Sequence, residues 1–226
     1  MGILSGEEIK KEIERGNIDI NPLKDEQIKP ASVDLTLGGE VFLASEDNKA
    51  YLDKGDVLTL PAGEMALVLT RERLNLSKEV VGSIGLRSYF SRKGIDLLAG
   101  PQVDPGFKGP LHVVLLNLSP SPQIIQYGEE FLTLEFRQLA EPVEKPYRGK
   151  YYDLDSITSE EIRDIKKGKG IALSEAVEAM RNIARDVSSL EKNVKQLTKK
   201  TDLWIGIFVS SFVALAIALI VKLAIG

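Results

Sequence analysis

Cysteine is missing from this chain, and histidine occurs only once, at His112. Without cysteine there are no disulfide bonds, no thiolate nucleophiles and no cysteine-ligated zinc. A single histidine also excludes the histidine-rich clusters that hold zinc in many enzymes. Any catalysis must therefore rest on carboxylates, hydroxyls, cations or a metal ion held by oxygen atoms.

An excess of positive charge is missing as well. The formal net charge is −4, with 29 Lys and Arg against 33 Asp and Glu. A groove for nucleic acid needs a clear excess of Lys and Arg to neutralise phosphates, so we expect no nucleic-acid partner. The N-terminus lacks a basic segment followed by an apolar one, which predicts that no secretory signal is present.

A long apolar run stands near the C-terminal end, where residues 203–221 read LWIGIFVSSFVALAIALIV. At about 1.5 Å per residue a helix of this length matches the core of a bilayer. Residues 203–222 therefore predict a single-pass C-terminal membrane anchor, and the alternative is a buried core helix. The positive-inside rule places the region before it in the cytoplasm, because three lysines precede the run: Lys195, Lys199 and Lys200.

The 226 residues divide into a head at 1–155, a charged linker and helical coiled coil at 156–200, and the predicted anchor. In the head, Ser5 and Glu8 form a capping-box pattern that predicts a helix over residues 6–15. Short apolar stretches between turn signals follow, which is typical of a closed or sandwiched, mainly β fold. The predicted strands are residues 33–37, 40–44, 57–60, 65–69, 80–84, 111–118, 124–126 and 131–137.

A heptad pattern runs through the linker region. One core position holds Leu173, Met180, Val187 and Val194, and the other holds Ala176, Ile183, Leu190 and Leu197. Such a repeat predicts a self-associating coiled coil. The alternative is a single amphipathic helix lying on the head or on the membrane. Valine at one position and leucine at the other favours two strands, but Met180 and Ala176 leave the number of strands open.

Two short motifs in the head carry potential site chemistry. Arg87 and Ser88 are followed by Arg92, and guanidinium groups suit phosphate oxygens. Residues 103–109 place Asp104 on a Pro-Gly turn beside Phe107, where a carboxylate and an aromatic face could hold a sugar. Taken alone both signals are weak, because Arg-Ser pairs are common on surfaces and Asp-Pro-Gly is first of all a turn.

Together these motifs resemble the signature of the dUTPase and dCTP deaminase superfamily. Arg87 and Ser88 resemble its phosphate motif, and residues 103–109 resemble its substrate motif. Residues 3–5 and 27–38 resemble the opening of dCTP deaminases, and residues 147–151 resemble the tail that closes over the nucleotide. The blocks keep the family's spacing over the head, which is most similar to archaeal-type dUTPases with a deaminase-like N-terminus.

This resemblance implies a distorted jelly-roll subunit in a homotrimer, with sites between subunits and Mg²⁺ carried by the triphosphate of deoxyuridine triphosphate. Asp104 would be catalytic, orienting the water and contacting the sugar, while Phe107 would stack on the deoxyribose. Backbone groups near Ala99 and Val103 would read the uracil edge. The other implied substrate-binding residues are Arg87, Ser88, Arg92, Gly109, Tyr147 and Lys150.

The choice of reaction depends on one position. Deaminases of the superfamily need a glutamate where this chain has Val114, so the resemblance favours hydrolysis of dUTP to dUMP and pyrophosphate. A membrane-bound deoxynucleotide sensor without activity is the alternative, because Tyr89, Thr133 and Tyr152 depart from the family pattern. A dCTP deaminase ranks third. His112 is interpreted as a structural or surface residue.

Overall fold

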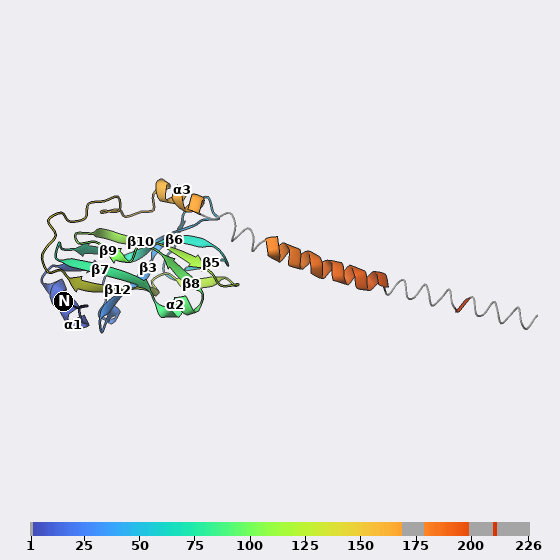
Figure 1. The fold of residues 1–226 in the computed structure, drawn as a ribbon, viewed down its shortest axis with the longest axis horizontal. Coiled ribbons are helices and arrows are strands. Elements are labelled where there is room, and N and C mark those ends of the chain that lie inside the picture. The colour runs from blue at the N-terminus through green and yellow to red at the C-terminus, as the bar shows by residue number, and fades with distance from the viewer. Residues whose placement is uncertain (1, 169–178, 199–209, 212–226) are drawn as a thin grey trace, which may run out of the picture. The chain divides into compact units, whose positions relative to one another are not determined.

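The structure is a computed structural model that describes residues 2–168, 179–198 and 210–211. Contacts divide the chain into two compact units, Met1–Ser174 and Glu175–Gly226. The first unit is built mainly of antiparallel strands, as predicted (Figure 1).

A curled sheet of ten strands forms most of the first unit. Its main path runs β8-β10-β6-β3-β12-β7-β9, and a separate two-stranded sheet pairs β11 with β5. The strands are β1 (Ile18–Asn21), β2 (Ile28–Lys29), β3 (Ser32–Leu43), β4 (Ala50–Tyr51), β5 (Val57–Leu60), β6 (Met65–Leu76), β7 (Val80–Leu86), β8 (Ile95–Leu98), β9 (Gln102–Val103), β10 (Lys108–Asn117), β11 (Gln123–Gln126) and β12 (Glu130–Gln138). A short 3₁₀ turn occupies Asp25–Gln27, and the short helix α2 spans Ser88–Arg92.

Helix α1 (Gly6–Glu14) begins where the sequence predicts it. The Ser5 hydroxyl accepts the backbone N–H of Glu8, and the Glu8 carboxylate accepts the backbone N–H of Ser5 at 2.8 Å. Each of these bonds satisfies a donor that a helix end otherwise leaves open. Ile9 is fully buried, so the helix is also fixed to the core of the head.

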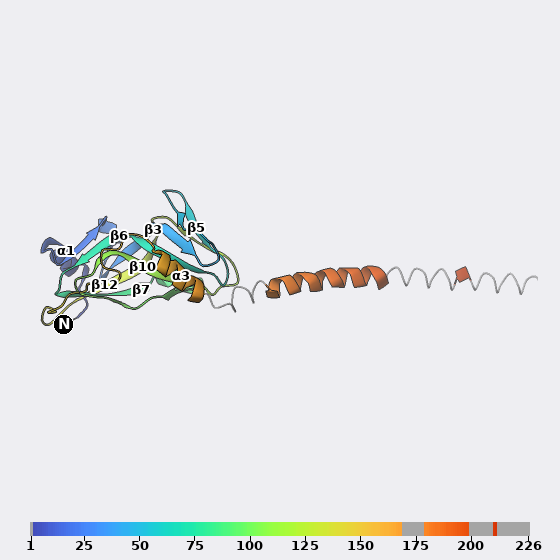
Figure 2. The same cartoon turned by 90° about the horizontal axis from the view of Figure 1, so that it is seen from above.

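Helix α3 (Ser159–Gly168) covers part of the outer face of the sheet (Figure 2). Ile157, just before the helix, is 2% exposed and belongs to an apolar cluster with Phe42, Leu67 and Leu69. Three partly buried side chains pack against this cluster: Val114, Ile162 and Ile165. The segment predicted to be a charged linker thus begins with a helix that packs on β3, β6 and β10.

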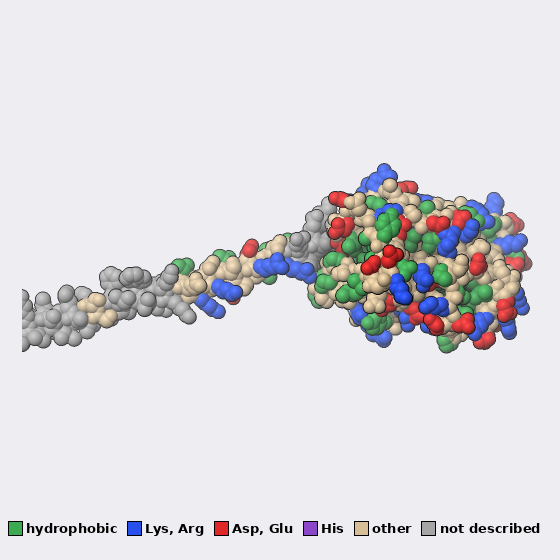
Figure 3. Space-filling model, turned by 180° about the vertical axis from the view of Figure 1, so that it is seen from behind, with side chains coloured by type: hydrophobic (Ala, Val, Ile, Leu, Met, Phe, Trp, Pro, Cys, Tyr) green, Lys and Arg blue, Asp and Glu red, His purple; other side chains and the backbone are tan. Residues whose placement is uncertain are grey.

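Charged side chains of both signs are interspersed over the face of the first unit seen in Figure 3. The mixture of signs on this face is in keeping with the net charge of −4. The absence of a nucleic-acid partner stays a prediction.

In the second unit the structure describes a helix over residues 179–198. The heptad side chains within it are exposed, from Val187 at 50% to Met180 at 69%. An apolar stripe that remains in water is what a coiled coil covers by self-association. The coiled coil stays a prediction, and its first two heptad residues, Leu173 and Ala176, lie outside the described residues.

The predicted membrane localisation is corrected by the structure. Among the residues that it describes, no helix is both long and apolar enough to cross a bilayer. A span needs about 20 consecutive, predominantly apolar residues, whereas the helices described here are short or carry many charges. Apart from Ser210 and Ser211, the run at 203–222 lies outside the described residues.

Candidate functional site

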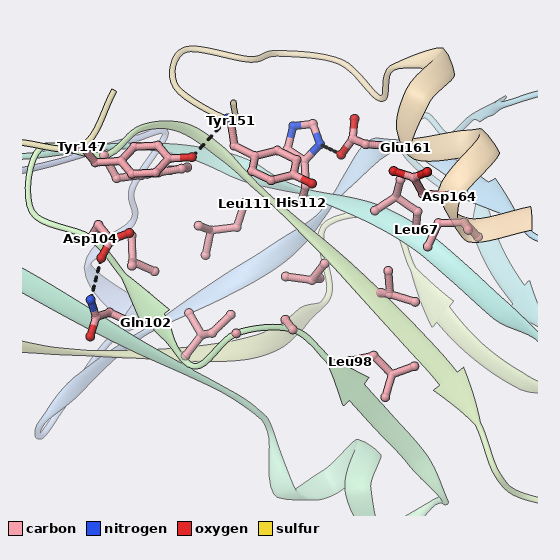
Figure 4. A pocket seen from close by; sticks show the side chains of 18 residues that line it. Leu67, Leu98, Gln102, Asp104, Leu111, His112, Tyr147, Tyr151, Glu161 and Asp164 are labelled. Atoms are coloured by element: carbon pink, nitrogen blue, oxygen red, sulfur yellow. Dashed lines mark hydrogen bonds and ion pairs between the residues drawn. The ribbon is translucent and has the colours of Figure 1, made fainter. Parts of the chain in front are cut away.

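A pocket of about 400 Å³ lies between the loop that joins β8 to β9, the middle of β10, the segment after β12, and α3 (Figure 4). Pockets of about 300–1,000 Å³ suit small molecules the size of a nucleoside. The pocket lining includes four residues that were predicted to bind the base, the sugar and the water: Ala99, Val103, Asp104 and Phe107. Tyr147 of the predicted tail also lines the pocket.

Asp104 stands on a tight turn at the mouth of this pocket. The backbone N–H of Phe107 donates to the carbonyl of Asp104 at 3.0 Å, which closes the turn. The Gln102 amide donates to the Asp104 carboxylate at 2.5 Å and fixes its orientation (Figure 4). Gly106 has a φ of +84°, and a Cβ at this position would lie 2.4 Å from Pro146, so the turn requires glycine.

Phe107 forms an aromatic wall that continues into the tail. Its ring lies 5.9 Å from the ring of Tyr147, centroid to centroid, with an angle of 39° between the planes. The backbone N–H of Tyr147 donates to the carbonyl of Pro105 at 2.8 Å, so tail and turn are bonded directly. The predicted tail residue Tyr147 and the predicted sugar-binding residue Phe107 are therefore brought together.

Part of the pocket lining is apolar. Val114 on β10 pairs in register with Leu98 on β8 and with Leu67 on β6, and all three side chains line the pocket. Val114 also packs against the buried cluster of Phe42, Leu67, Leu69 and Ile157, against which Ile162 and Ile165 of α3 pack as well. Strand β10 thus carries an apolar side chain at position 114, where the family resemblance implies a glutamate in a deaminase.

The predicted phosphate residues lie elsewhere. The described residues that line the pocket do not include Arg87, Ser88 or Arg92. The Arg87 guanidinium donates to Glu130 at 2.9 Å and lies 3.2 Å from Asp34. A guanidinium has five N–H donors, so the contacts with these two carboxylates leave some of its donors unused. Arg92 donates weakly to the Ser88 hydroxyl, at 3.4 Å.

Two further predicted residues also lie outside the pocket lining. Lys150 donates to Glu160 of α3 at 3.1 Å, and this hydrogen bond raises the pKa of Lys150. Gly109 has a φ of +127° and lies beside the backbone of Leu154. Both residues thus contact the segment that leads into α3, or α3 itself.

The three departures from the family pattern each have a local partner. Tyr89 is 50% exposed, with the Lys93 ammonium 4.0 Å from its ring centroid. The Thr133 hydroxyl donates to Asp34 at 2.8 Å. The ring of Tyr152 lies 4.1 Å from the Arg148 guanidinium. None of the three lines the pocket among the residues described there, so they do not obstruct it in a single chain.

Sequence reasoning missed the pairing of His112 with Glu161. His112 Nδ1 lies 2.8 Å from Glu161 Oε1, and both side chains are almost fully buried, at 4% and 6% exposure. Thr158 donates its N–H and hydroxyl to the other carboxylate oxygen of Glu161, at 2.8 and 2.9 Å. The pattern Thr158-x-x-Glu161 is a capping box, a sequence signal for the start of α3, but nothing local connects it to His112.

The pKa of Glu161 reflects opposing effects. Burial alone would raise it, but hydrogen bonds from His112 and Thr158 outweigh burial, so the pKa lies below the ordinary value of 4.5. A carboxylate whose pKa is lowered on folding stabilises the fold above its ordinary pKa, and this contribution is lost as the pH falls through the lowered value.

We therefore expect α3 to stay on the sheet at neutral pH and to loosen as the pH falls below about 4.5. The Ile162 methyl resonance, followed by NMR from about pH 7 to about pH 3, should shift in this range. Asp153 acts in the same direction, since hydrogen bonds from Lys108 and Arg73 lower its pKa. A Glu161→Gln variant should remove the Glu161 step. An unchanged step in that variant would assign it to another group.

No cluster of His, Asp or Glu suited to a metal ion occurs in the part of the chain that the structure describes. Two of the carboxylates around the pocket are held by other side chains, Asp104 by Gln102 and Glu161 by His112. A divalent cation would thus depend on oxygen atoms that a ligand brings with it, since Mg²⁺ prefers oxygen ligands and often binds through substrate phosphates.

A mainly β head with an Asp-Pro-Gly turn beside a small pocket fits the dUTPase and dCTP deaminase superfamily that the sequence motifs resemble. Comparisons with known proteins confirm this membership. A family model for dCTP deaminase-like proteins matches residues 3–139, more than half of the chain. The chain belongs to this family, within the dUTPase and dCTP deaminase superfamily of nucleotide-processing enzymes.

Individual relatives carry two different names. The chain is 37% identical over 156 residues to the probable deoxyuridine 5′-triphosphate nucleotidohydrolase of Sulfolobus islandicus rod-shaped virus 1, covering 69% of this chain and 96% of that protein. It is 39% identical over 139 residues to the dCTP deaminase of Thermococcus kodakarensis, covering 61% and 86%. Membership of the family therefore leaves the reaction open between hydrolysis and deamination.

The fold is shared with a solved structure. The 2′-deoxycytidine 5′-triphosphate deaminase of Agrobacterium tumefaciens superimposes with a TM-score of 0.53 at 20% identity, covering 61% of this chain and 48% of that chain. At this identity the match supports the fold alone.

Proposed function

We propose that the protein is a dUTP diphosphatase, which hydrolyses dUTP to dUMP and pyrophosphate. The observation that carries the proposal is one pocket that Asp104 and Phe107 line together with the apolar side chain of Val114. A general base and a flat sugar-binding ring are what the hydrolysis needs, whereas removal of the 4-amino group would need a proton shuttle at the base.

In this mechanism Asp104 holds the attacking water. The water oxygen bonds to the α-phosphorus while the bond from that phosphorus to the bridging oxygen of the β-phosphate breaks. The proton of the water passes to Asp104, and pyrophosphate leaves. Phe107 stacks on the deoxyribose and leaves no space for a 2′-hydroxyl, so UTP is expected to bind poorly.

The phosphates would be bound by Arg87, Ser88 and Arg92 of a second copy in a homotrimer. This arrangement accounts for their position outside the pocket of their own chain. Preorganised cationic donors stabilise the charge that develops during phosphoryl transfer. Mg²⁺ would arrive bound to the triphosphate and neutralise part of its charge. Backbone groups at Ala99 and Val103 would read the uracil edge, and Tyr147 and Lys150 of the tail would close over the nucleotide.

Deamination of dCTP is a second candidate. It is favoured by the relatives named dCTP deaminase and by the carboxylates of Glu161 and Asp164, which α3 brings to the pocket that Val114 lines. A deoxynucleotide-binding sensor without catalytic activity is the third candidate. It is favoured by the pairing of Arg87, a predicted phosphate-binding residue, with Asp34 and Glu130.

One assay separates these candidates. The full chain is incubated with Mg²⁺ and dUTP, dCTP, dTTP or UTP, and pyrophosphate and ammonia are followed in parallel. We expect pyrophosphate from dUTP and no ammonia from dCTP. Ammonia release from dCTP would establish the deaminase instead. Binding of dUTP without either product would point to the sensor.

A further inference from the structure

Helix α3 belongs to the pocket although it lies outside the part of the chain that defines the family. The family model ends at residue 139, and α3 begins at Ser159. Nevertheless Glu161, Asp164 and Ile165 line the same pocket as Asp104 and Phe107. Figure 4 shows Glu161 and Asp164 on the side of the pocket across from Leu98 and Gln102.

The imidazole of His112 is the buried side chain that holds this helix in place. Its Nδ1 contacts Glu161 at 2.8 Å, and its Nε2 lies 3.1 Å from the carbonyl oxygen of Leu154, in the segment before α3. A carboxylate and a carbonyl are both acceptors, so each ring nitrogen faces one acceptor group of the α3 segment. Strand β10 thus holds the start of α3 and the segment before it through one side chain.

Other polar contacts of α3 and of Ile157, two residues before it, are closer to solvent. The backbone of Ile157 donates to Glu40 at 3.1 Å and accepts from Lys49 at 2.9 Å. Lys166 pairs with Asp47 at 2.7 Å, and Asp47 is 92% exposed. Exposed pairs of this kind contribute little, whereas a buried pair that loses one partner leaves an uncompensated charge.

We propose that α3 is a wall of the nucleotide pocket in its own chain, and that His112 and Glu161 are the positioning pair that holds it there. This inference rests on the proposed function, since the occupant is the pyrimidine end of a deoxynucleotide. Glu161, Asp164 and Ile165 line the pocket only while α3 is docked, and Ile162 and Ile165 then pack against the apolar cluster of Phe42, Leu67, Leu69 and Ile157. Substrate affinity therefore depends on how often α3 is docked.

The size of the effect follows from the docked fraction. If only the docked state binds, the apparent dissociation constant equals the intrinsic one divided by the fraction of molecules in that state. A variant docked about one tenth of the time would bind about tenfold more weakly. Once substrate is bound, α3 is in place, so the chemical step is expected to proceed at its normal rate.

The test compares two variants of the pair with a matched control in the full chain. His112→Gln removes the ring and keeps the Thr158–Glu161 cap, and Glu161→Gln removes the charge. Asp47→Asn makes the same carboxylate-to-amide change at the exposed contact with Lys166. We expect the KM for dUTP to rise about tenfold in both pair variants, with kcat within about twofold of the wild type. Asp47→Asn should leave both constants unchanged.

Amide hydrogen exchange of residues 159–168 provides the second readout. Without nucleotide, exchange should be faster in His112→Gln than in the wild type, and saturating dUTP should slow it in both. Faster exchange combined with a wild-type KM would overturn the inference, because α3 would then open without affecting binding. A lowered kcat at unchanged KM would also overturn it.

Failure of the proposed function gives a different result. A wild-type chain that neither binds nor hydrolyses dUTP, dCTP or dTTP removes the proposed function and this inference with it. A wild-type chain that binds dUTP while both pair variants bind it equally well removes only the role of α3.

Discussion

Replacing Asp104 by asparagine is expected to reduce pyrophosphate release from dUTP by about 10³-fold, because a positioned general base contributes about 10²–10⁴-fold. Asparagine keeps a carbonyl oxygen in the place where Asp104 accepts from the Gln102 amide, so the turn should persist. An amide cannot take the proton of the attacking water. The loss should therefore appear in kcat, with dUTP binding largely kept.

The measurement is steady-state pyrophosphate release by the full chain, with dUTP binding followed by calorimetry. Asp96→Asn is the matched control, since Asp96 is exposed on β8 and does not line the pocket among the residues described there. It should retain wild-type kcat and KM. An Asp104→Asn variant with more than about a tenth of the wild-type kcat would exclude Asp104 as the general base.

Replacing Glu72 by alanine is expected to lower the free energy of unfolding by about 3–5 kcal/mol. Glu72 lies on β6 and is 1% exposed. Its carboxylate accepts the Gln27 amide at 2.9 Å, the Thr36 backbone N–H at 2.7 Å and the Thr36 hydroxyl at 2.6 Å. Each buried donor left without a partner costs about 1–3 kcal/mol, and alanine leaves three such donors.

Urea unfolding followed by circular dichroism measures this loss. Asn75→Ala provides the control, because Asn75 is exposed on the same strand and should change stability by less than about 0.5 kcal/mol. Glu72→Gln keeps one acceptor oxygen and should fall between the two. A loss below about 1 kcal/mol in Glu72→Ala would mean that water replaces the carboxylate at this point.

Local signals predicted much of the fold. The capping box of Ser5 and Glu8 predicted α1 to within a residue, and β5 matches the predicted residues 57–60. The expected break between residues 37 and 40 is absent, because Gly38 and Gly39 lie within one long strand whose register with β6 shifts between Leu37 and Val41. Strand pairing tolerates such an irregularity. In the sequence, the pair of glycines resembles a turn, so two separate strands were expected.

The candidate site was predicted only as far as the family pattern extends. Asp104, Phe107, Ala99 and Val103 meet in one pocket with Tyr147, as that pattern implies. The contribution of α3 was not predicted, because its apolar stripe is short and its charges resemble those of a solvated linker. Glu161 and His112 are 49 residues apart, and only the tertiary fold brings them together.

The packing of α3 also determines at which residue a recombinant fragment of the head can end. A fragment that ends at residue 155 loses Ile157, Ile162 and Ile165, which cover Phe42, Leu67 and Leu69 on the outer face of the sheet. Those side chains would become a contiguous apolar patch in water, and such patches promote aggregation. Recombinant forms of the head that reach residue 168 keep the patch covered and should be the more soluble ones.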